Sequence, residues 1–354
     1  MSSTIIRRVC SQVSVGGVLI GGNAPVSIQS MTNVDTRNII LTVEQIKSLS
    51  SLGCDIVRLA VQDMEAAKAI ETIKMIVKDV PLVADIHFDY RLALECIKNG
   101  IDKVRINPGN IGDKDRVREV VTAAKERGIP IRVGVNSGSV EKEILAKYGE
   151  PSAEAMVESA LGHVRILEDL NFTDTVISLK ASNVMTTIDA YRILASKCEY
   201  PLHVGVTEAG TLKSGTLKSA IGIGTLLAEG IGDTIRVSLT SEPENEVTTA
   251  QEILKALGIR NKGVEFISCP TCGRCQIDLI GIAEQVELAL KNCDKDIKVA
   301  VMGCGVNGPG EAREADIGIA GGDNCAILFR HGEIVRRIPQ SEVVAELLKE
   351  IEKL

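Results

Sequence analysis

The sequence predicts an α/β protein in which an N-terminal (β/α)8 barrel, residues 1–260, precedes a small α+β domain, residues 261–354. Short β-branched segments alternate with amphipathic segments eight times, several amphipathic segments end at a glycine, and the alternation stops after Gly258. Strands that alternate with helices form parallel sheets, and eight such units in about 250 residues are typical of a closed barrel. An open, doubly wound sheet is the alternative, disfavoured because no G-x-G-x-x-G motif follows the first strand.

The elements follow in order along the chain. The barrel strands are predicted at 26–31, 56–61, 82–86, 104–107, 131–136, 176–180, 202–207 and 235–240. The helices are predicted at 43–52, 64–77, 91–98, 117–126, 153–170, 188–198, 217–228 and 247–257. Left-handed glycine caps are expected at Gly53, Gly100, Gly128, Gly230 and Gly258. Segment 13–20, centred on Gly16-Gly17, predicts a hairpin that caps the bottom of the barrel.

The second domain has a different order of elements. Strands are predicted at 264–268 and 299–302, with a helix over 277–290 between them. A glycine-rich stretch, a hairpin around His331-Gly332 and a helix from Ser341 follow. This mixture is typical of an α+β domain.

Composition excludes several classes of protein. Hydrophobic residues make up 45% and charged residues 25%, as in a globular protein, and no apolar run approaches the roughly 20 residues that span a bilayer. The net charge of -7 and the 2% of aromatic residues argue against nucleic-acid binding. Polar residues and glycines interrupt the N-terminal segment where a signal peptide would need an apolar core, so we expect a cytoplasmic protein with ten reduced cysteines.

Basic residues occur inside the predicted barrel strands. Arg58, Arg105, Arg132 and Arg236 each stand between two apolar residues. Because neighbours in a strand face opposite sides, these arginines should point into the barrel, as should Lys180 near the end of the sixth strand. Asp85 and Glu208 are too few to neutralise five cations, so a phosphate or diphosphate is the expected counter-ion. The alternative is that salt bridges simply order the barrel.

Polar residues cluster where the strands end, which is where barrel enzymes place their active sites. The candidates at this mouth are Asp85, His87, Asn107, Asn136, Glu208 and Ser238.

The densest group of thiols is Cys269, Cys272 and Cys275, and Cys304 follows in a glycine-rich turn. A C-P-x-C knuckle suits zinc or an iron–sulfur cluster. The cluster is favoured because no second C-x-x-C pair completes a zinc ribbon and because glycines let backbone approach a bulky ligand. The six other cysteines are scattered, and buried packing is expected for them.

Three motifs together resemble the bacterial 4-hydroxy-3-methylbut-2-enyl diphosphate synthase family: S-C-P-T-C-G-R at 268–274, N-G-P-G-E at 307–311 and H-V-G-V-T-E-A-G at 203–210. The resemblance extends over essentially the whole chain, including Q-S-M-T at 29–32, A-D-I-H-F at 84–88 and R-I-N-P-G at 105–109. No additional central domain, as in the plant-type members, interrupts it.

The resemblance implies a [4Fe–4S] cluster in the small domain, held by Cys269, Cys272, Cys304 and Glu311. A carboxylate ligand is weaker than a thiolate, so substrate could displace it. The family motif has no ligand at Cys275, and we expect this residue to start the following helix with its thiol turned away.

The resemblance also implies a two-electron reductive ring opening and dehydration of 2-C-methyl-D-erythritol 2,4-cyclodiphosphate to the linear allylic diphosphate. It implies that the diphosphate is bound by Arg58, Arg105, Arg132, Lys180 and Ser238, with Arg236 beside them. Asp85, His87, Asn107 and Asn136 would complete the mouth, Glu208 would act as the acid, and Asn307 would contact a substrate hydroxyl.

Ferredoxin or flavodoxin would supply electrons, in a homodimer whose cluster domain caps the partner's barrel. Two rival functions stay open from the residues alone. One is a barrel lyase or pterin-type transferase with a structural zinc tail, and the other is an electron carrier or nucleic-acid module. A carrier, however, has no use for five interior cations.

Overall fold

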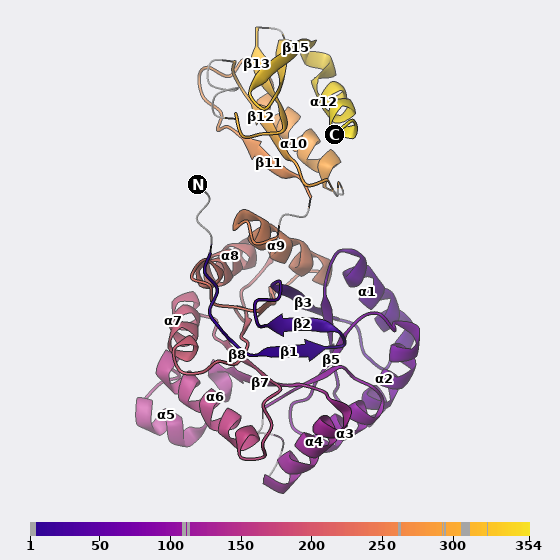
Figure 1. Cartoon of the computed structure of the whole chain (residues 1–354), viewed down its shortest axis with the longest axis vertical. Helices are drawn as coiled ribbons and strands as arrows, with labels where there is room; N and C mark the ends of the chain where they lie inside the picture. The colour runs from indigo at the N-terminus through magenta and orange to yellow at the C-terminus, as the bar shows by residue number, and fades with distance from the viewer. Residues whose placement is uncertain are drawn as a thin grey trace. The chain divides into compact units, whose positions relative to one another are not determined.

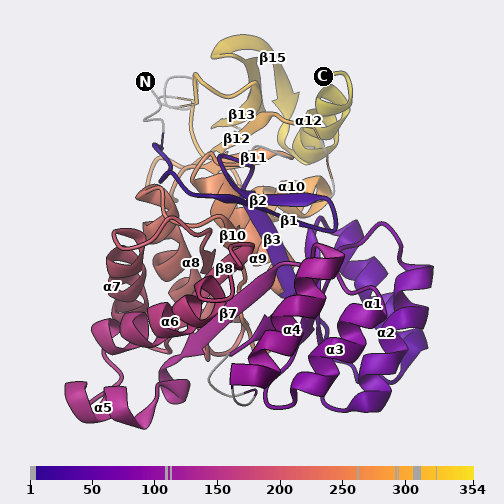
Figure 2. The same ribbon diagram turned by 60° about the horizontal axis from the view of Figure 1, so that its bottom comes forward.

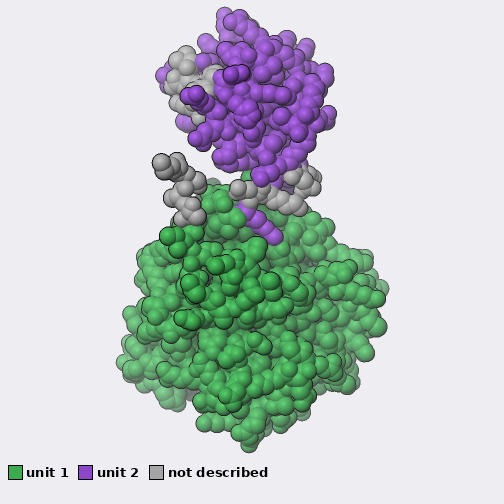
Figure 3. All heavy atoms as spheres, in the orientation of Figure 1, with its two compact units in different colours: residues 1–259 green, residues 260–354 purple. Residues whose placement is uncertain are grey.

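The computed structural model describes residues 5–107, 111, 114–260, 263–291, 293, 295–305, 312–323 and 325–354. The chain divides into two compact units, residues 1–259 and 260–354 (Figure 3). Each unit has its own buried apolar core. The two are therefore described separately.

The first unit is a closed parallel barrel. Its strands are β3 (Ser27–Met31), β4 (Ile56–Ala60), β5 (Leu82–Asp85), β6 (Lys103–Ile106), β7 (Ile131–Asn136), β8 (Thr175–Lys180), β9 (His203–Val204) and β10 (Thr234–Ile235). They pair in the order β8-β7-β6-β5-β4-β3-β10-β9. A parallel bridge between Ile177 and Leu202 joins β8 to the segment entering β9 and closes the ring. The barrel prediction is confirmed, and the open doubly wound sheet is excluded.

Helices surround the strands in both ribbon views (Figure 1, Figure 2). They are α1 (Ile39–Ser51), α2 (Met64–Ile76), α3 (Tyr90–Lys98), α4 (Lys114–Arg127), α5 (Lys142–Tyr148), α6 (Ala153–Glu168), α7 (Val184–Ala195), α8 (Leu212–Ala228) and α9 (Pro243–Ala256). Side chains such as Asn38 and Asp63 cap helix N-termini, and all five expected cap glycines have positive φ. In the part of the chain that the structure describes, no helix is both long and apolar enough to span a membrane.

Helix α5 was not expected from the sequence. It has seven residues, buries none of them, and ends at Gly149 with a φ of 79°. Ile144, Leu145 and Tyr148 are only partly buried against the barrel core, so this short helix gives a weaker periodic signal than the others.

The predicted hairpin covers the amino-terminal end of the barrel. Strands β1 (Gln12–Val15) and β2 (Val18–Gly21) are antiparallel, and Gly16 and Gly17 both adopt the positive φ that a two-residue hairpin turn needs. Val15 and Ile20 pack against Ile56, the first residue of β4. The hairpin prediction is confirmed, and the carboxyl ends of the strands form the opposite mouth of the barrel.

Strands β9 and β10 are shorter than the predicted 202–207 and 235–240. Beside them, a Cβ atom on Gly205 would lie 2.5 Å from the carbonyl oxygen of Arg236. The two backbones approach each other closely here, and a side chain at position 205 would collide with the Arg236 carbonyl.

Within its described residues, the second unit contains a five-stranded sheet and the α-helices α10 and α12. Its strands are β11 (Glu265–Ser268), β12 (Lys298–Met302), β13 (Ile317–Gly322), β14 (Cys325–Arg330) and β15 (Glu333–Pro339), paired in that order. Helices α10 (Leu279–Leu290) and α12 (Val343–Glu352) share one core with the sheet. The hairpin at His331-Gly332 is confirmed, with both residues at positive φ. Because β11, β12 and β13 are parallel, their carboxyl ends meet at one edge.

Candidate active site

Basic side chains enter the barrel from five of its strands or their extensions. Arg58, Arg105, Arg132 and Lys180 are each no more than 8% exposed, and the Arg236 side chain is 17% exposed. The residues flanking them, such as Val57 and Leu59 around Arg58, belong to the apolar core between sheet and helices. The cations therefore point into the barrel, as the alternation of strand residues predicts.

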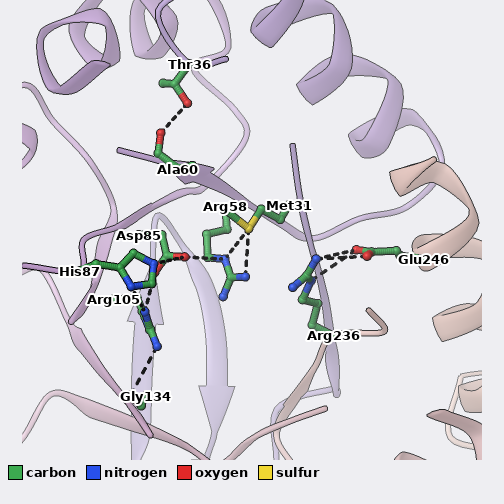
Figure 4. A network of polar contacts seen from close by, with 10 residues as sticks. All are labelled: Met31, Thr36, Arg58, Ala60, Asp85, His87, Arg105, Gly134, Arg236 and Glu246. Atoms are coloured by element: carbon green, nitrogen blue, oxygen red, sulfur yellow. Dashed lines mark hydrogen bonds and ion pairs between the residues drawn. The ribbon is translucent and has the colours of Figure 1, made fainter. Parts of the chain in front are cut away.

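Asp85 at the end of β5 gathers one group of these side chains (Figure 4). Its carboxylate accepts a hydrogen bond from Arg105 Nη1 at 3.1 Å, and it lies 3.7 Å from Arg58 Nε and 3.6 Å from His87 Nε2. Burial by itself would raise the pKa of Asp85, but Arg58, His87 and Arg105 together hold it well below its ordinary value. The carboxylate is thus ionised and shared among three partners.

Arg58 has weak partners for a buried guanidinium. Its Nε and Nη2 donate to the thioether sulfur of Met31 at 3.1 and 3.0 Å, and thioethers are poor acceptors. Burial lowers the pKa of Arg58 to about 10. An anion with better acceptors would therefore be bound readily here.

Gly134 on β7 makes room for Arg105. The Arg105 Nη2 donates to the Gly134 carbonyl at 3.4 Å. A Cβ atom at position 134 would lie 2.7 Å from Arg105 Nε. Because Gly134 has no side chain, there is space beside β7 for the Arg105 guanidinium, which also reaches Asp85.

Arg236 is neutralised by a carboxylate from outside the strands. Its Nη2 and Nε lie 3.1 and 3.3 Å from the two oxygens of Glu246 on α9 (Figure 4). Glu246 also accepts from the Ser30 hydroxyl at 2.9 Å and from the backbone N–H of Leu239 at 3.1 Å. This pair is the salt bridge that the alternative interpretation of the arginines predicted. Asp85 pairs with Arg105 and Arg58 in the same way, but it divides one negative charge between them.

Among the described residues, no carboxylate forms an ion pair with Arg132 or Lys180. Arg132 is 1% exposed, and among the described residues nothing accepts a hydrogen bond from its Nε or Nη1. Burial, followed by Arg236, Arg58 and Arg132, lowers the pKa of Lys180 well below its ordinary value. Buried positive charge without counter-charge is strongly unfavourable, so this side of the barrel is suited to an anionic ligand.

The other predicted residues lie around the carboxyl ends of the strands, where barrel enzymes carry their chemistry. Asn107 follows β6 and is buried, Asn136 ends β7, and Ser238 lies just beyond β10. Glu208 is exposed and adopts a left-handed φ of 51°, which is uncommon for a residue other than glycine. Among the described residues, no hydrogen bond or ion pair joins Glu208 to the Asp85 group.

In the second unit, cysteines collect at the edge formed by the carboxyl ends of β11 and β12. The backbone N–H of Gly303 donates to Cys269 Sγ at 3.1 Å, which ties the knuckle after β11 to the residue before Cys304. The backbone N–H of Arg274, aided by its side chain, lowers the pKa of the exposed Cys272 thiol. Amide N–H groups directed at sulfur stabilise a thiolate, so these thiols have the donor chemistry of a soft-metal or iron–sulfur site.

The set of ligands that the family resemblance implies is incomplete within the described part of the chain. Asn307 and Glu311 lie outside the described residues. Among those that are described, no three His, Cys, Asp or Glu side chains are arranged to hold one metal ion.

Cys275 does not start a helix as expected, because α10 begins at Leu279. Its thiol instead donates to the carbonyl of Ile277 at 3.2 Å and packs against the core of the second unit. A Cβ atom on Gly303 would lie 2.8 Å from this sulfur. The thiol thus fills space beneath the Gly303 backbone.

Two charged residues of the barrel interior were missed from the sequence. Lys103 is two positions before Arg105, on the same face of β6, but the strand was predicted to begin at position 104. With β6 predicted to begin at position 103, the alternation of strand residues would have placed Lys103 inside the barrel. Glu246 gives no local signal, since an acidic residue in the first turn of a helix is normally solvent-exposed.

Comparison with known proteins gives matches over both units. The model of the GcpE TIM-barrel domain matches residues 10–251, and that of the GcpE protein C-terminal domain matches residues 265–353. A protein of Ruminiclostridium cellulolyticum named 4-hydroxy-3-methylbut-2-en-1-yl diphosphate synthase (flavodoxin) is 62% identical over 354 residues, 100% of each chain. A protein of the same name from Geobacter sulfurreducens is 60% identical over 343 residues, 97% of each chain.

Solved structures resemble the barrel alone. Dihydropteroate synthase from Thermus thermophilus has a TM-score of 0.51 at 16% identity, over 70% of this chain and 99% of that one. Type I 3-dehydroquinate dehydratase from Clostridium difficile has a TM-score of 0.51 at 13% identity, over 70% and 98%. At such identities the similarity concerns the fold only.

Proposed function

The chain belongs to the GcpE family, and we propose that it acts in non-mevalonate isoprenoid biosynthesis. Its substrate would be 2-C-methyl-D-erythritol 2,4-cyclodiphosphate. Reductive ring opening and dehydration would convert this substrate to 4-hydroxy-3-methylbut-2-enyl diphosphate. Relatives that are 62% and 60% identical over nearly the whole chain carry the name of this synthase. The observation in this chain that carries the proposal is the unneutralised positive charge buried in the barrel. A lyase or pterin-type transferase with a zinc tail is not favoured, because the likeness to dihydropteroate synthase is limited to the fold.

The diphosphate would be bound by the cations that lack a strong protein partner. Arg132 has two nitrogens free of partners among the described residues, and Arg58 donates to a thioether. Arg105 and Lys180 lie on the neighbouring strands, with Arg236 and Ser238 on the far side of the barrel mouth. Phosphate oxygens would replace weak or missing acceptors, so binding gains hydrogen bonds that the barrel by itself does not make.

The residues at the strand ends would orient the rest of the substrate. Asp85 keeps Arg58, Arg105 and His87 in fixed positions, and Asn107 and Asn136 complete the mouth. Glu208 is our candidate for the acid that protonates the departing hydroxyl, since it is exposed at this end of the barrel. Asn307 would contact a substrate hydroxyl.

The reaction balances with two electrons and one proton. A carbon–oxygen bond of the ring breaks and its electron pair stays on the phosphate, while a hydroxyl group takes up the proton and leaves as water. The cyclic diphosphate dianion thereby becomes a linear trianion. The negative charge in the barrel grows during the reaction, which its cations favour.

We further propose that Cys269, Cys272, Cys304 and Glu311 hold a [4Fe–4S] cluster, which supplies the two electrons one at a time when bound. Support comes from the cysteine edge itself, where the Gly303 N–H donates to Cys269 and the pKa of Cys272 is lowered. Cys275 would stay outside the ligand set, engaged with the Ile277 carbonyl.

The printed name of the relatives supports flavodoxin as the electron donor, with ferredoxin as the alternative. We propose a cytoplasmic homodimer in which the cluster domain of one subunit serves the barrel of the other. Mixed dimers of Glu208→Gln and Cys304→Ser subunits test this arrangement. Activity should recover in the mixture, and a mixture as inactive as both parents would contradict it.

Anaerobic turnover of the cyclic diphosphate with a chemical reductant tests the function as a whole, with iron counted per chain. The expected result is formation of the linear diphosphate by protein that holds about four irons per chain. Protein with full iron content and no turnover would overturn the proposed function.

A further inference from the structure

Lys103 is a buried lysine that the proposed reaction does not use. It opens β6, and the sheet register sets Val83 opposite both Lys103 on β6 and Arg58 on β4. Val83 packs against the hairpin that closes the bottom of the barrel. Lys103 therefore enters the barrel below Arg105, in the layer nearest the closed end.

The Lys103 amino group is shielded from solvent and has no hydrogen-bond partner among the described residues. The residue is 0% exposed, and no described atom forms a hydrogen bond with Nζ. The charged and titratable groups on the strands around it are Arg58, Asp85, Arg105, Arg132, Lys180 and His203.

None of the nearby carboxylates serves Lys103. Asp85 is already shared by Arg58, Arg105 and His87, and the carboxylate of Glu246 is bonded to Arg236. Burial, followed by the charges of Arg132 and Arg58, lowers the pKa of Lys103 well below its ordinary value. In the anion-free protein this environment therefore disfavours the ammonium form of Lys103 and favours the neutral amine.

A bound diphosphate would change this environment. Arg58 and Arg132 are the groups that act on Lys103 most strongly after burial, and both belong to the proposed diphosphate site. A dianion held between these guanidinium groups reverses the sign of the local potential, which then favours an ammonium over an amine.

We propose that Lys103 takes up one proton from solution when a diphosphate binds in the barrel, so that anion binding and protonation of this amine are one coupled event. The proton adds to the amine lone pair, and no bond of the ligand changes. This inference rests on the proposed function for the identity of the ligand. Ring opening then adds a further negative charge beside the ammonium that binding has created.

Two other groups could accept this proton. Lys180, whose pKa burial and the neighbouring cations also lower, is 7% exposed and so is not fully enclosed as Lys103 is. His203 is the other. It is 0% exposed, and both of its ring nitrogens lack a partner among the described residues. Burial and then the cations around it, Lys103 included, lower the pKa of His203 well below its ordinary value. An amine is intrinsically more basic than an imidazole by about four pKa units, so Lys103 is protonated first.

Calorimetric titration of the full-length, cluster-loaded protein with the cyclic diphosphate tests the coupling. Without a reductant no turnover occurs, and the ligand's diester phosphates do not titrate near neutral pH. Binding heats in two buffers of different ionisation enthalpy give the number of protons taken up. The wild type should take up about one proton per site, and its Kd should rise about tenfold per pH unit in this range. Lys103→Met should take up none, and its Kd should be independent of pH.

Two further variants locate the proton. Lys98→Met removes an exposed lysine of α3, and His203→Gln removes one competing acceptor, so both should keep the wild-type uptake. If Lys103→Met fails to fold, Lys103→Gln replaces it, and zero uptake by the wild type would already overturn the proposal.

Uptake that persists in Lys103→Met would also overturn the proposal, since His203 or Lys180 would then be the acceptor. Tight binding without any buffer dependence would refute the coupling and leave the proposed function intact. Failure of the cyclic diphosphate to bind at all would refute both.

Discussion

Arg236 and Arg132 lie on opposite sides of one barrel, and the protein neutralises one of them and not the other. Arg236 meets both oxygens of Glu246, which Ser30 and the Leu239 N–H hold in place. Arg132 is more deeply buried, and two of its nitrogens have no partner in the described parts of the chain. The Arg236 side is a finished salt bridge that ties α9 to the barrel, whereas the Arg132 side is incomplete without an anion.

Burial alone therefore does not distinguish a structural arginine from a ligand-binding one. A buried guanidinium with a dedicated carboxylate contributes to stability when it is paired. One without a carboxylate destabilises the free protein and gains its counter-charge from a ligand. Removing each arginine should therefore change stability in opposite directions.

The largest effect is expected from Arg132→Met. Loss of this diphosphate contact should lower kcat/KM about 1000-fold, while the removal of an uncompensated buried charge should leave unfolding stability unchanged or raise it by about 1 kcal/mol. Anaerobic steady-state kinetics and urea unfolding measure the two quantities. Arg192→Met, which removes an exposed arginine paired with Glu229, is the control and should keep wild-type kinetics. A loss of stability above about 1 kcal/mol would place Arg132 in the structural class with Arg236.

Glu246→Gln should lower stability by about 3 kcal/mol, because it leaves the Arg236 guanidinium buried against a neutral amide. Adding Arg236→Met to this variant should restore part of the loss, since no unpaired charge then remains. Urea unfolding of the two single variants and the double variant gives the coupling between the residues. Strictly additive effects would mean that the pair is not the structural unit described above.

Gly134→Ala should raise the KM for the cyclic diphosphate about tenfold, with a smaller change in kcat. The added methyl would lie 2.7 Å from Arg105 Nε and displace the guanidinium from its position between Gly134 and Asp85. Gly162→Ala on α6, where a Cβ atom meets nothing within 4 Å, is the matched control and should have wild-type kinetics. An unchanged KM would show that the position of Arg105 does not matter for binding.

The smallest quantity to be measured is a slope. Asp85→Asn leaves Arg58 and Arg105 without their shared carboxylate, which lowers stability at neutral pH, and it should also change the acid limb of stability. Since the pKa of Asp85 is lowered in the folded protein, its carboxylate contributes stability that is present above the unfolded value of about 4 and is lost as the pH falls below it. The variant should lose stability less steeply below about pH 4, by up to about 1.4 kcal/mol per pH unit. Unfolding measured from neutral pH to about pH 3 gives the slope, and Asp79→Asn at an exposed site should match the wild type. Equal slopes for Asp85→Asn and wild type would contradict the assigned ionisation.

Local patterns in the sequence determined the barrel, the glycine caps, both hairpins and the inward direction of the arginines. Each of these depends on backbone geometry over a few residues: a two-residue alternation, a helical period, or a positive φ at glycine. The ends of β9 and β10 could not be predicted in this way, because they depend on how these segments pair with strands distant in sequence.

Which cations receive a counter-charge was decided by the tertiary structure. Glu246 lies on a helix and has no strand-like pattern, yet folding brings it to Arg236 and to Ser30, 216 positions away in the chain. Lys103 is buried without a hydrogen-bond partner among the described residues, in the row that the pairing of β4, β5 and β6 also gives Arg58. Periodicity fixes the direction of a side chain, but the charges it faces come from segments distant in sequence. Their Coulomb energy depends on the distances and on the low dielectric constant of the interior.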